Sequence, residues 1–282
     1  FMWPQSVVNL NNKLREYQIQ EKREVERILL ELSQKLMPYT NSFHQNHYVL
    51  ARLDVVNAKA LYAYELKATE PIIDSNNYVA LWQAWHPLLE REKAVANDFT
   101  IHDHEYYIVT GANMAGKSTF LRSLGINYLL AMNGLPVFAD ELKVSVFHLF
   151  TSMRTTDDLT HGISYFNAEL LRLKKLLGSL HDDVPSLIIL DEILKGTNSL
   201  DKLNGSRLFL QYIAERNVTG VIATHDLELS KMENEYEGRF HNYCFEIELG
   251  EDITYSYKIT KGVARNQNAT YLLKGILKPN VF

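Results

Sequence analysis

A glycine-containing loop constrains the fold of this chain more than any other feature, namely "GANMAGKST" at residues 111–119. The loop matches the pattern Gly-x-x-x-x-Gly-Lys-[Ser/Thr] in full, follows the apolar run "YYIVTG" and precedes a helical segment from Lys117 to about Met132. In such loops, backbone N–H groups surround phosphates and the helix N-terminus adds a positive dipole end. The sequence therefore predicts a strand, a phosphate-binding loop and a helix in succession.

The loop defines the first predicted site residues. We expect every residue of the loop to contact ATP, namely Gly111, Ala112, Asn113, Met114, Ala115, Gly116, Lys117, Ser118 and Thr119. Lys117 should reach the β- and γ-phosphates as a catalytic cation, and Ser118 should offer its hydroxyl to Mg²⁺. The Asn113 carboxamide either binds a phosphate or bridging oxygen or braces the loop.

Two further apolar runs end in polar residues. "SLIILDE" at 186–192 is typical of a buried parallel strand and ends in Asp191 and Glu192, where ligands of α/β proteins bind. Asp191 should hold Mg²⁺, and Glu192 should orient or deprotonate the attacking water, although such an acidic pair can also merely cap a helix. "GVIATH" at 220–225 ends in His225, which we expect to sense the γ-phosphate or position water, although a lone histidine is more often structural.

The second half of the chain alternates between strand and helix patterns. We expect a strand over 143–153, helices over about 165–180 and 200–216, and an antiparallel edge formed by strands 242–249 and 253–261. This alternation predicts an α/β fold with a mostly parallel sheet and helices on both faces.

The first 75 residues have a helical pattern instead. Val25, Ile28, Leu29, Leu32 and Leu36 form an apolar stripe at helical spacing, which Pro38 ends, and a second helical pattern closes before Pro71. We therefore predict a helical segment at 1–75 and a nucleotide-binding domain at 76–282. The helices either pack on a neighbour as a simple hairpin or act as a lever that transmits force.

Composition limits the remaining classes. The net charge is −5, so no bulk positive charge indicates nucleic-acid binding, although a basic patch can lie on one face. Cys244 is the only cysteine, which suits a reducing compartment, and no apolar run approaches the roughly 18 residues that span a bilayer. With no signal peptide in view, we expect a cytoplasmic protein without membrane contact in these residues. The opening Phe-Met-Trp-Pro suggests a piece of a longer protein.

Several motifs together resemble the MutS family of DNA mismatch-repair ATPases. "TGANMAGKST" is similar to that family's Gly-Pro-Asn-Met-Gly-Gly-Lys-Ser-Thr, "LDEILKGTNSLD" to its Asp-Glu-Ile-Gly-Arg-Gly-Thr-Ser-Thr and "ATHDLEL" to its Ala-Thr-His segment. "DDLTHGISYFNAEL" at 157–170 resembles the family's Asp-Asp-Leu, Gly-x-Ser, Phe and Glu pattern. "HPLLE", "AVAND" and the helices of residues 10–70 follow in the family's order.

The resemblance implies an ABC-like ATPase that works as a homodimer with two composite ATP sites and Mg²⁺. Each site would be completed by the partner's Gly-x-Ser segment, which maps Ser164 onto a contact with the γ-phosphate bound by the other subunit. Asn198 and Ser199 would lie near the partner. DNA binding is implied through regions largely outside this chain.

Some residues depart from the family pattern. Ala115 replaces a loop glycine, which is tolerable if that residue keeps a negative φ, and Leu194 and Lys202 replace glycines after the Asp-Glu pair. Family members hold adenine between aromatic side chains. Here Ala94 occupies one such place, so we expect the adenine contacts to come from Val95 and Tyr257.

Two other functions stay open. No mismatch-reading domain is present in these residues, so the ATPase can serve a non-mismatch task, on another DNA structure or with a membrane-linked partner. The transporter signature Leu-Ser-Gly-Gly-Gln is absent from the sequence, which counts against a transporter. A nucleotide-binding scaffold without turnover is the third possibility, and the intact Lys117, Asp191, Glu192 and His225 argue against it.

Overall fold

The computed structural model describes residues 4–153, 165–180, 183–195, 197–249 and 253–265. Contacts divide the chain into two compact units, Phe1–Ala60 and Leu61–Phe282. We refer to them as the helical unit and the sheet unit and describe each by itself.

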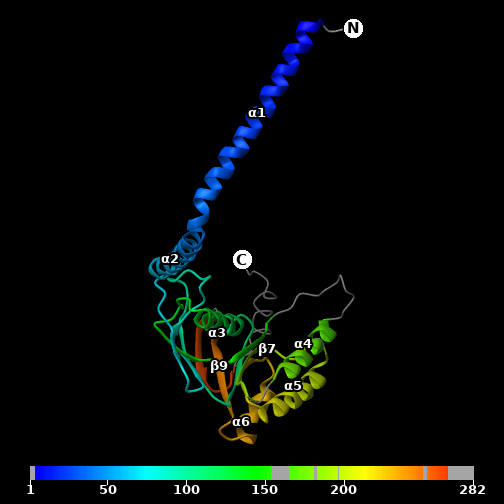
Figure 1. Ribbon diagram of the computed structural model, residues 1–282. Helices are drawn as coiled ribbons and strands as arrows, with labels where there is room; N and C mark the ends of the chain where they lie inside the picture. The colour runs from blue at the N-terminus through cyan, green and yellow to red at the C-terminus, as the bar shows by residue number, and fades with distance from the viewer. Residues whose placement is uncertain (1–3, 154–164, 181–182, 196, 250–252, 266–282) are drawn as a thin grey trace, which may run out of the picture. The chain divides into compact units, whose positions relative to one another are not determined.

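Two helices and a short connection form the first part of the chain (blue in Figure 1), as the apolar spacing predicted. They are α1 (Gln5–Leu36), the 3₁₀ turn η1 (Met37–Tyr39) and α2 (Thr40–Leu66). The break falls at Pro38, which lacks the N–H that a continuing helix needs. Neither helix contains a buried residue, so the apolar stripe of α1 is exposed along its length.

A six-stranded sheet in the order β10-β9-β4-β8-β7-β6 forms the centre of the sheet unit. All neighbouring strands are parallel except β10 and β9, which confirms the predicted mostly parallel sheet with an antiparallel edge. The strands are β4 (Tyr106–Gly111), β6 (His148–Ser152), β7 (Ser186–Asp191), β8 (Val218–Ala223), β9 (Phe240–Leu249) and β10 (Ile253–Lys261).

Alternating side chains of the central strands pack against helices on opposite faces. Leu187 and Ile189 of β7 share a core with Leu121 and other residues of α3 (Lys117–Met132). Ile188 and its neighbours face α4 (Tyr165–Ser179) and α5 (Ser199–Ala214), through residues such as Leu176. Helices therefore cover both faces of the sheet, as predicted, and the strand ends between them are free to form a site (Figure 1).

A second sheet, which the sequence did not predict, packs into the same core as α3. It has the order β1-β5-β2-β3 and consists of β1 (Ile72–Asp74), β2 (Tyr78–Ala84), β3 (Asn97–His102) and β5 (Glu141–Ser145). The predicted single strand over 143–153 was wrong, because β5 and β6 belong to different sheets. The Tyr128 hydroxyl explains the break, since it donates to the Ser145 carbonyl at 3.0 Å and accepts from the Phe147 amide at 2.7 Å.

The remaining short elements are η2 (Leu227–Lys231) and α6 (Met232–Glu235), which precede β9. Within the described residues, no helix combines the length and apolar character that a bilayer crossing requires.

Candidate functional site

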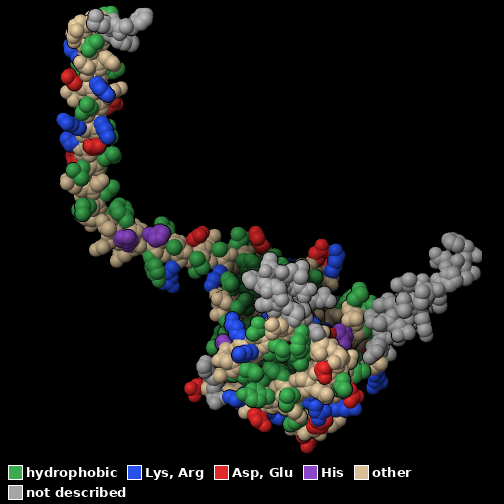
Figure 2. Space-filling model, turned by 90° about the vertical axis from the view of Figure 1, so that its right-hand side faces the viewer, with side chains coloured by type: hydrophobic (Ala, Val, Ile, Leu, Met, Phe, Trp, Pro, Cys, Tyr) green, Lys and Arg blue, Asp and Glu red, His purple; other side chains and the backbone are tan. Residues whose placement is uncertain are grey.

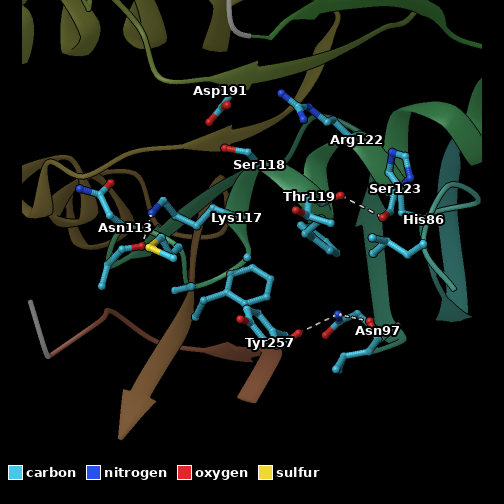
Figure 3. Close-up of a pocket in the computed structure, with 18 of the residues that line it drawn as sticks. His86, Asn97, Asn113, Lys117, Ser118, Thr119, Arg122, Ser123, Asp191 and Tyr257 are labelled. Atoms are coloured by element: carbon cyan, nitrogen blue, oxygen red, sulfur yellow. Dashed lines mark hydrogen bonds between the residues drawn. The ribbon is translucent and has the colours of Figure 1, made fainter. Parts of the chain in front are cut away.

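A cleft of about 860 Å³ opens at the carboxyl ends of β4, β7 and β8 (Figure 3). It brings together residues that are far apart in the sequence, as expected where parallel strands end at the same edge of a sheet. Of the predicted site residues, the cleft is lined by Val95, Ala112, Asn113, Met114, Ala115, Gly116, Lys117, Ser118, Thr119, Asp191, Glu192, His225 and Tyr257. Gly111 does not line it but accepts a bond from Lys117.

The loop after β4 takes a backbone path that needs its two glycines. Gly111 has φ 152°, and a Cβ there would lie 2.9 Å from the Phe245 carbonyl oxygen. Gly116 caps α3 with φ 113°, where L side chains are strained. Ala115 is not among the residues with positive φ, so alanine is accommodated at this position as expected.

Lys117 is buried inside its own loop. Its Nζ donates to the carbonyl oxygens of Gly111 at 2.7 Å and Ala112 at 2.9 Å. Burial lowers the pKa of Lys117 to about 8, and the carboxylates of Glu192 and Asp191 oppose this shift. The ammonium is therefore poorly solvated and would gain from an added anion in the cleft.

Ser118 and Asp191 offer hard oxygen donors in the same cleft (Figure 3). Ser118 lies in the first turn of α3 and Asp191 ends β7, where its side chain is buried. Mg²⁺ in nucleotide sites is bound through one or two protein oxygens together with waters and substrate phosphates. A hydroxyl and a single carboxylate fit that requirement.

The Glu192 carboxylate lies between the side chains of His225 and Lys202. Its Oε1 is 3.1 Å from His225 Nε2, and its Oε2 accepts a hydrogen bond from Lys202 Nζ at 3.3 Å. Burial lowers the pKa of His225, and the charge of Lys117 lowers it further, while Glu192 opposes the shift. Lys202, which sequence reasoning noted only as a departure from a glycine, is thus an ion-pair partner of Glu192.

Tyr257 reaches the cleft because β10 is irregular at this point. The pairing of β10 with β9 shifts register between Tyr255 and Ile259, and Tyr257 has φ 51°. The Asn97 carboxamide holds the irregular segment, since it donates to the Tyr257 carbonyl at 3.0 Å and accepts from the Ile259 amide at 2.9 Å. A Cβ on Gly116 would lie 3.2 Å from the Tyr257 ring, so the tyrosine lies directly against the glycine loop.

Sequence reasoning gave no role to several polar or charged residues of the cleft, among them His86, Asn97, Arg122 and Lys195. His86 and Asn97 belong to "HPLLE" and "AVAND", which were recognised in order but given no role. Burial lowers the pKa of His86, and the charge of Arg122 adds to this effect. Arg122 lies five positions after Lys117 on α3 (Figure 3). The sequence around it indicates only a helix and does not predict that its side chain lines the cleft.

Part of the predicted interface lies outside the described residues. Ser164 falls there, so its predicted contact with a partner's phosphate stays a prediction. Asn198 is described and caps α5, because its side chain accepts the Asp201 amide at 3.0 Å. That cap accounts for the asparagine locally.

Comparison with known proteins identifies the family. The model of a family described as MutS domain V matches residues 107–279. The endonuclease MutS2 of Latilactobacillus sakei is 36% identical over 286 residues, which cover 99% of this chain and 36% of the relative. The putative endonuclease MutS2 of Bacillus subtilis is 32% identical over 283 residues, again 99% of this chain and 36% of the relative.

The chain thus spans about a third of the length of the curated relatives that it matches. The family match covers β4 from Tyr107 onward, the loop after it, the Asp191–Glu192 pair, His225 and β10, whereas the cleft residues His86, Val95 and Asn97 precede it. Because the family model matches more than half of the chain, this chain belongs to the MutS family.

Proposed function

We propose that this chain hydrolyses ATP with Mg²⁺ in the cleft at the ends of β4, β7 and β8. One observation carries the proposal: a glycine loop with a buried lysine, an aspartate at a strand end, and a glutamate paired with a histidine all line one cleft. Phosphoryl transfer needs little covalent chemistry from a protein and depends on positioning and charge stabilisation. These residues supply both.

Each group has a distinct role in this proposal. Lys117 Nζ turns away from the carbonyl oxygens of its loop and towards the β- and γ-phosphates. The phosphate oxygens then take the place of those carbonyls as its hydrogen-bond acceptors. Ser118 and Asp191 would hold Mg²⁺, which neutralises phosphate charge when bound. Glu192 orients the attacking water and accepts its proton, while His225 fixes the Glu192 carboxylate and contacts the γ-phosphate end.

The side of the cleft that faces away from Asp191 suits the base (Figure 3). Tyr257 offers an aromatic face and Val95 an apolar contact, and both line the cleft on the side of Asn97. A purine ring fits such a surface through stacking on one side. This arrangement supports adenine binding with one aromatic residue where the family pattern has two.

The wider role follows from family membership and is also a proposal. We assign residues 1–75 to a lever segment and 76–282 to an ABC-like ATPase domain that acts in the cytoplasm as a homodimer with composite ATP sites. Ser164, Asn198 and Ser199 would face the partner subunit, and regions largely outside this chain would contact DNA. A non-mismatch task is the second candidate, because the relatives are MutS2 proteins, named as endonucleases.

Two variants test the ATPase proposal. Lys117→Ala should abolish binding of a fluorescent ATP analogue, because the loop loses the cation that faces the phosphates. Glu192→Gln should bind ATP normally but lose hydrolysis by at least about a hundredfold, since a carboxamide cannot accept the water proton. Normal nucleotide affinity in the first variant, or normal turnover in the second, refutes the corresponding assignment.

A further inference from the structure

Glu169 is a buried carboxylate on α4 that the proposed mechanism does not use. Its Oε1 accepts the backbone N–H of Leu194 at 2.7 Å, and its Oε2 accepts the N–H of Lys195 at 2.9 Å. A buried carboxylate is unfavourable unless hydrogen bonds replace its water, and bonds to an ionised acceptor are about twice as strong as neutral ones. Glu169 therefore fixes two successive amides of the segment that follows β7.

That segment has a backbone that needs external support. Glu192 has φ 65° and Leu194 has φ 58°, although neither is a glycine. Such conformations persist only where the surroundings hold them in place. The other supports are the Glu192 amide, which donates to the Ala223 carbonyl at 2.9 Å, and Gly205, where a Cβ would lie 2.4 Å from Leu194 Cδ1. β8, α4 and α5 thus hold the segment from three sides.

The same segment carries the proposed base. Glu192 precedes the two anchored amides by two and three residues, and its carboxylate lies between His225 and Lys202. A second cavity of about 10 Å³, bordered by Glu169, Asp191 and Glu192 among others, has room for about one water. The Glu169 side chain therefore borders the same small cavity as the Asp191–Glu192 pair.

We propose that Glu169 is a positioning residue for ATP hydrolysis, which holds Glu192 in place through the amides of Leu194 and Lys195. This inference rests on the proposed role of Glu192. It makes α4 one of the elements that set the position of the base.

The test is Glu169→Gln in the full chain with Mg²⁺ and ATP. Glutamine keeps the length of the side chain and one acceptor, but its NH₂ group faces the second amide without accepting from it. We expect kcat to fall by about tenfold to a hundredfold, as for a small misplacement of a catalytic group, and KM for ATP to change by less than about threefold. Amide hydrogen exchange over residues 190–195 should become faster.

Glu169→Asp provides a second variant if the glutamine variant folds poorly. Aspartate keeps the charge but is one methylene shorter, so it reaches one amide and not both. We expect its kcat to lie between those of the unaltered chain and Glu169→Gln. Adding Glu169→Gln to Glu192→Gln should lower the residual rate no further, because the base that Glu169 positions is already absent.

Glu233→Gln is the matched control for a merely structural effect. Glu233 also accepts a backbone amide, that of Asn242 at 3.0 Å, but it lies on α6 outside the cleft. We expect Glu233→Gln to lower the melting temperature, because an acceptor of the Asn242 amide is weakened, and to leave kcat unchanged. An equal loss of kcat in both variants overturns the inference.

The outcomes separate this inference from the proposed function. Unchanged kcat in both Glu169 variants, with hydrolysis lost in Glu192→Gln, overturns the inference alone. Normal turnover in Glu192→Gln overturns the assignment of the base and the role of Glu169 with it.

Discussion

The helical unit and the sheet unit use the same apolar residue types in opposite ways. In α1, Leu10, Leu14 and Leu29 are more than half exposed, and the helix buries no residue. In β4, β7 and β8, every residue is buried, including the polar ones. An apolar stripe at helical spacing therefore shows that a helix forms and leaves open whether the same chain covers it.

The difference locates the stability of this chain. Burial of apolar surface is the main favourable term in folding. The sheet unit therefore contributes most of the stability of this chain. In α1, the described ion pairs lie on the surface, for example Lys35 with Glu31 at 2.8 Å, and such exposed pairs contribute little to stability. Green side chains are distributed along the surface of the helices in Figure 2.

Leu187→Ala should have the largest effect on stability. Leu187 of β7 is fully buried in the core that α3 shares with both sheets, so alanine leaves a cavity there. We expect a loss of about 2–5 kcal/mol in the free energy of unfolding. Urea unfolding followed by tryptophan fluorescence measures it, since Trp85 is buried in the same unit. A loss below about 1 kcal/mol would contradict the assignment of stability to this core.

Tyr106→Phe should have an intermediate effect. The hydroxyl of this fully buried tyrosine donates to the Ile213 carbonyl at 2.7 Å, and phenylalanine leaves that buried carbonyl without its donor. We expect a loss of about 1 kcal/mol in the same urea experiment. Tyr17→Phe on α1 is the matched control, because Tyr17 is 66% exposed and should lose nothing measurable. Equal losses in the two variants would remove the distinction between the units.

Leu29→Ala in α1 should have the smallest effect. Its side chain is 57% exposed, so truncation removes little buried surface, and alanine is the better helix former. We expect a change within about 0.5 kcal/mol, measured by circular dichroism during urea unfolding. A loss as large as that of Leu187→Ala would mean that the stripe is covered in solution, and a dependence on protein concentration would identify a second copy as the cover.

Most strands of the six-stranded sheet could be predicted from the sequence because their apolar runs are typical of buried parallel strands. "YYIVTG", "SLIILD" and "GVIA" are unbroken apolar runs, and such runs belong to parallel strands buried on both faces. The second sheet was missed because β3, "NDFTIH", mixes polar and apolar residues and forms no unbroken apolar run. No glycine or proline lies between β5 and β6. The chain breaks there because its backbone bonds to the Tyr128 hydroxyl, a tertiary contact that the local sequence does not reveal.

The site was predicted as far as local motifs extend. Residues 112–119, Asp191, Glu192 and His225 line one cleft because each follows a strand end, a position that sequence patterns reveal. Asn97 and Arg122 act on residues that lie far away in the sequence, Tyr257 and His86 respectively, so no local pattern indicates them. Lys202 lies only ten residues after Glu192, but its role depends on the 3.3 Å approach of its Nζ to the Glu192 carboxylate, which the sequence does not reveal.

The irregular segment of β10 has a consequence for how this protein can change over evolutionary time. Tyr257 lies on β10, the last strand of its sheet, where the Asn97 carboxamide holds it, whereas the glycine loop follows β4, an inner strand. Insertions and substitutions are tolerated at edges and are costly in packed interiors. A change of the aromatic residue at position 257 would therefore alter the proposed contact with the base and leave the buried strands β4, β7 and β8 as they are.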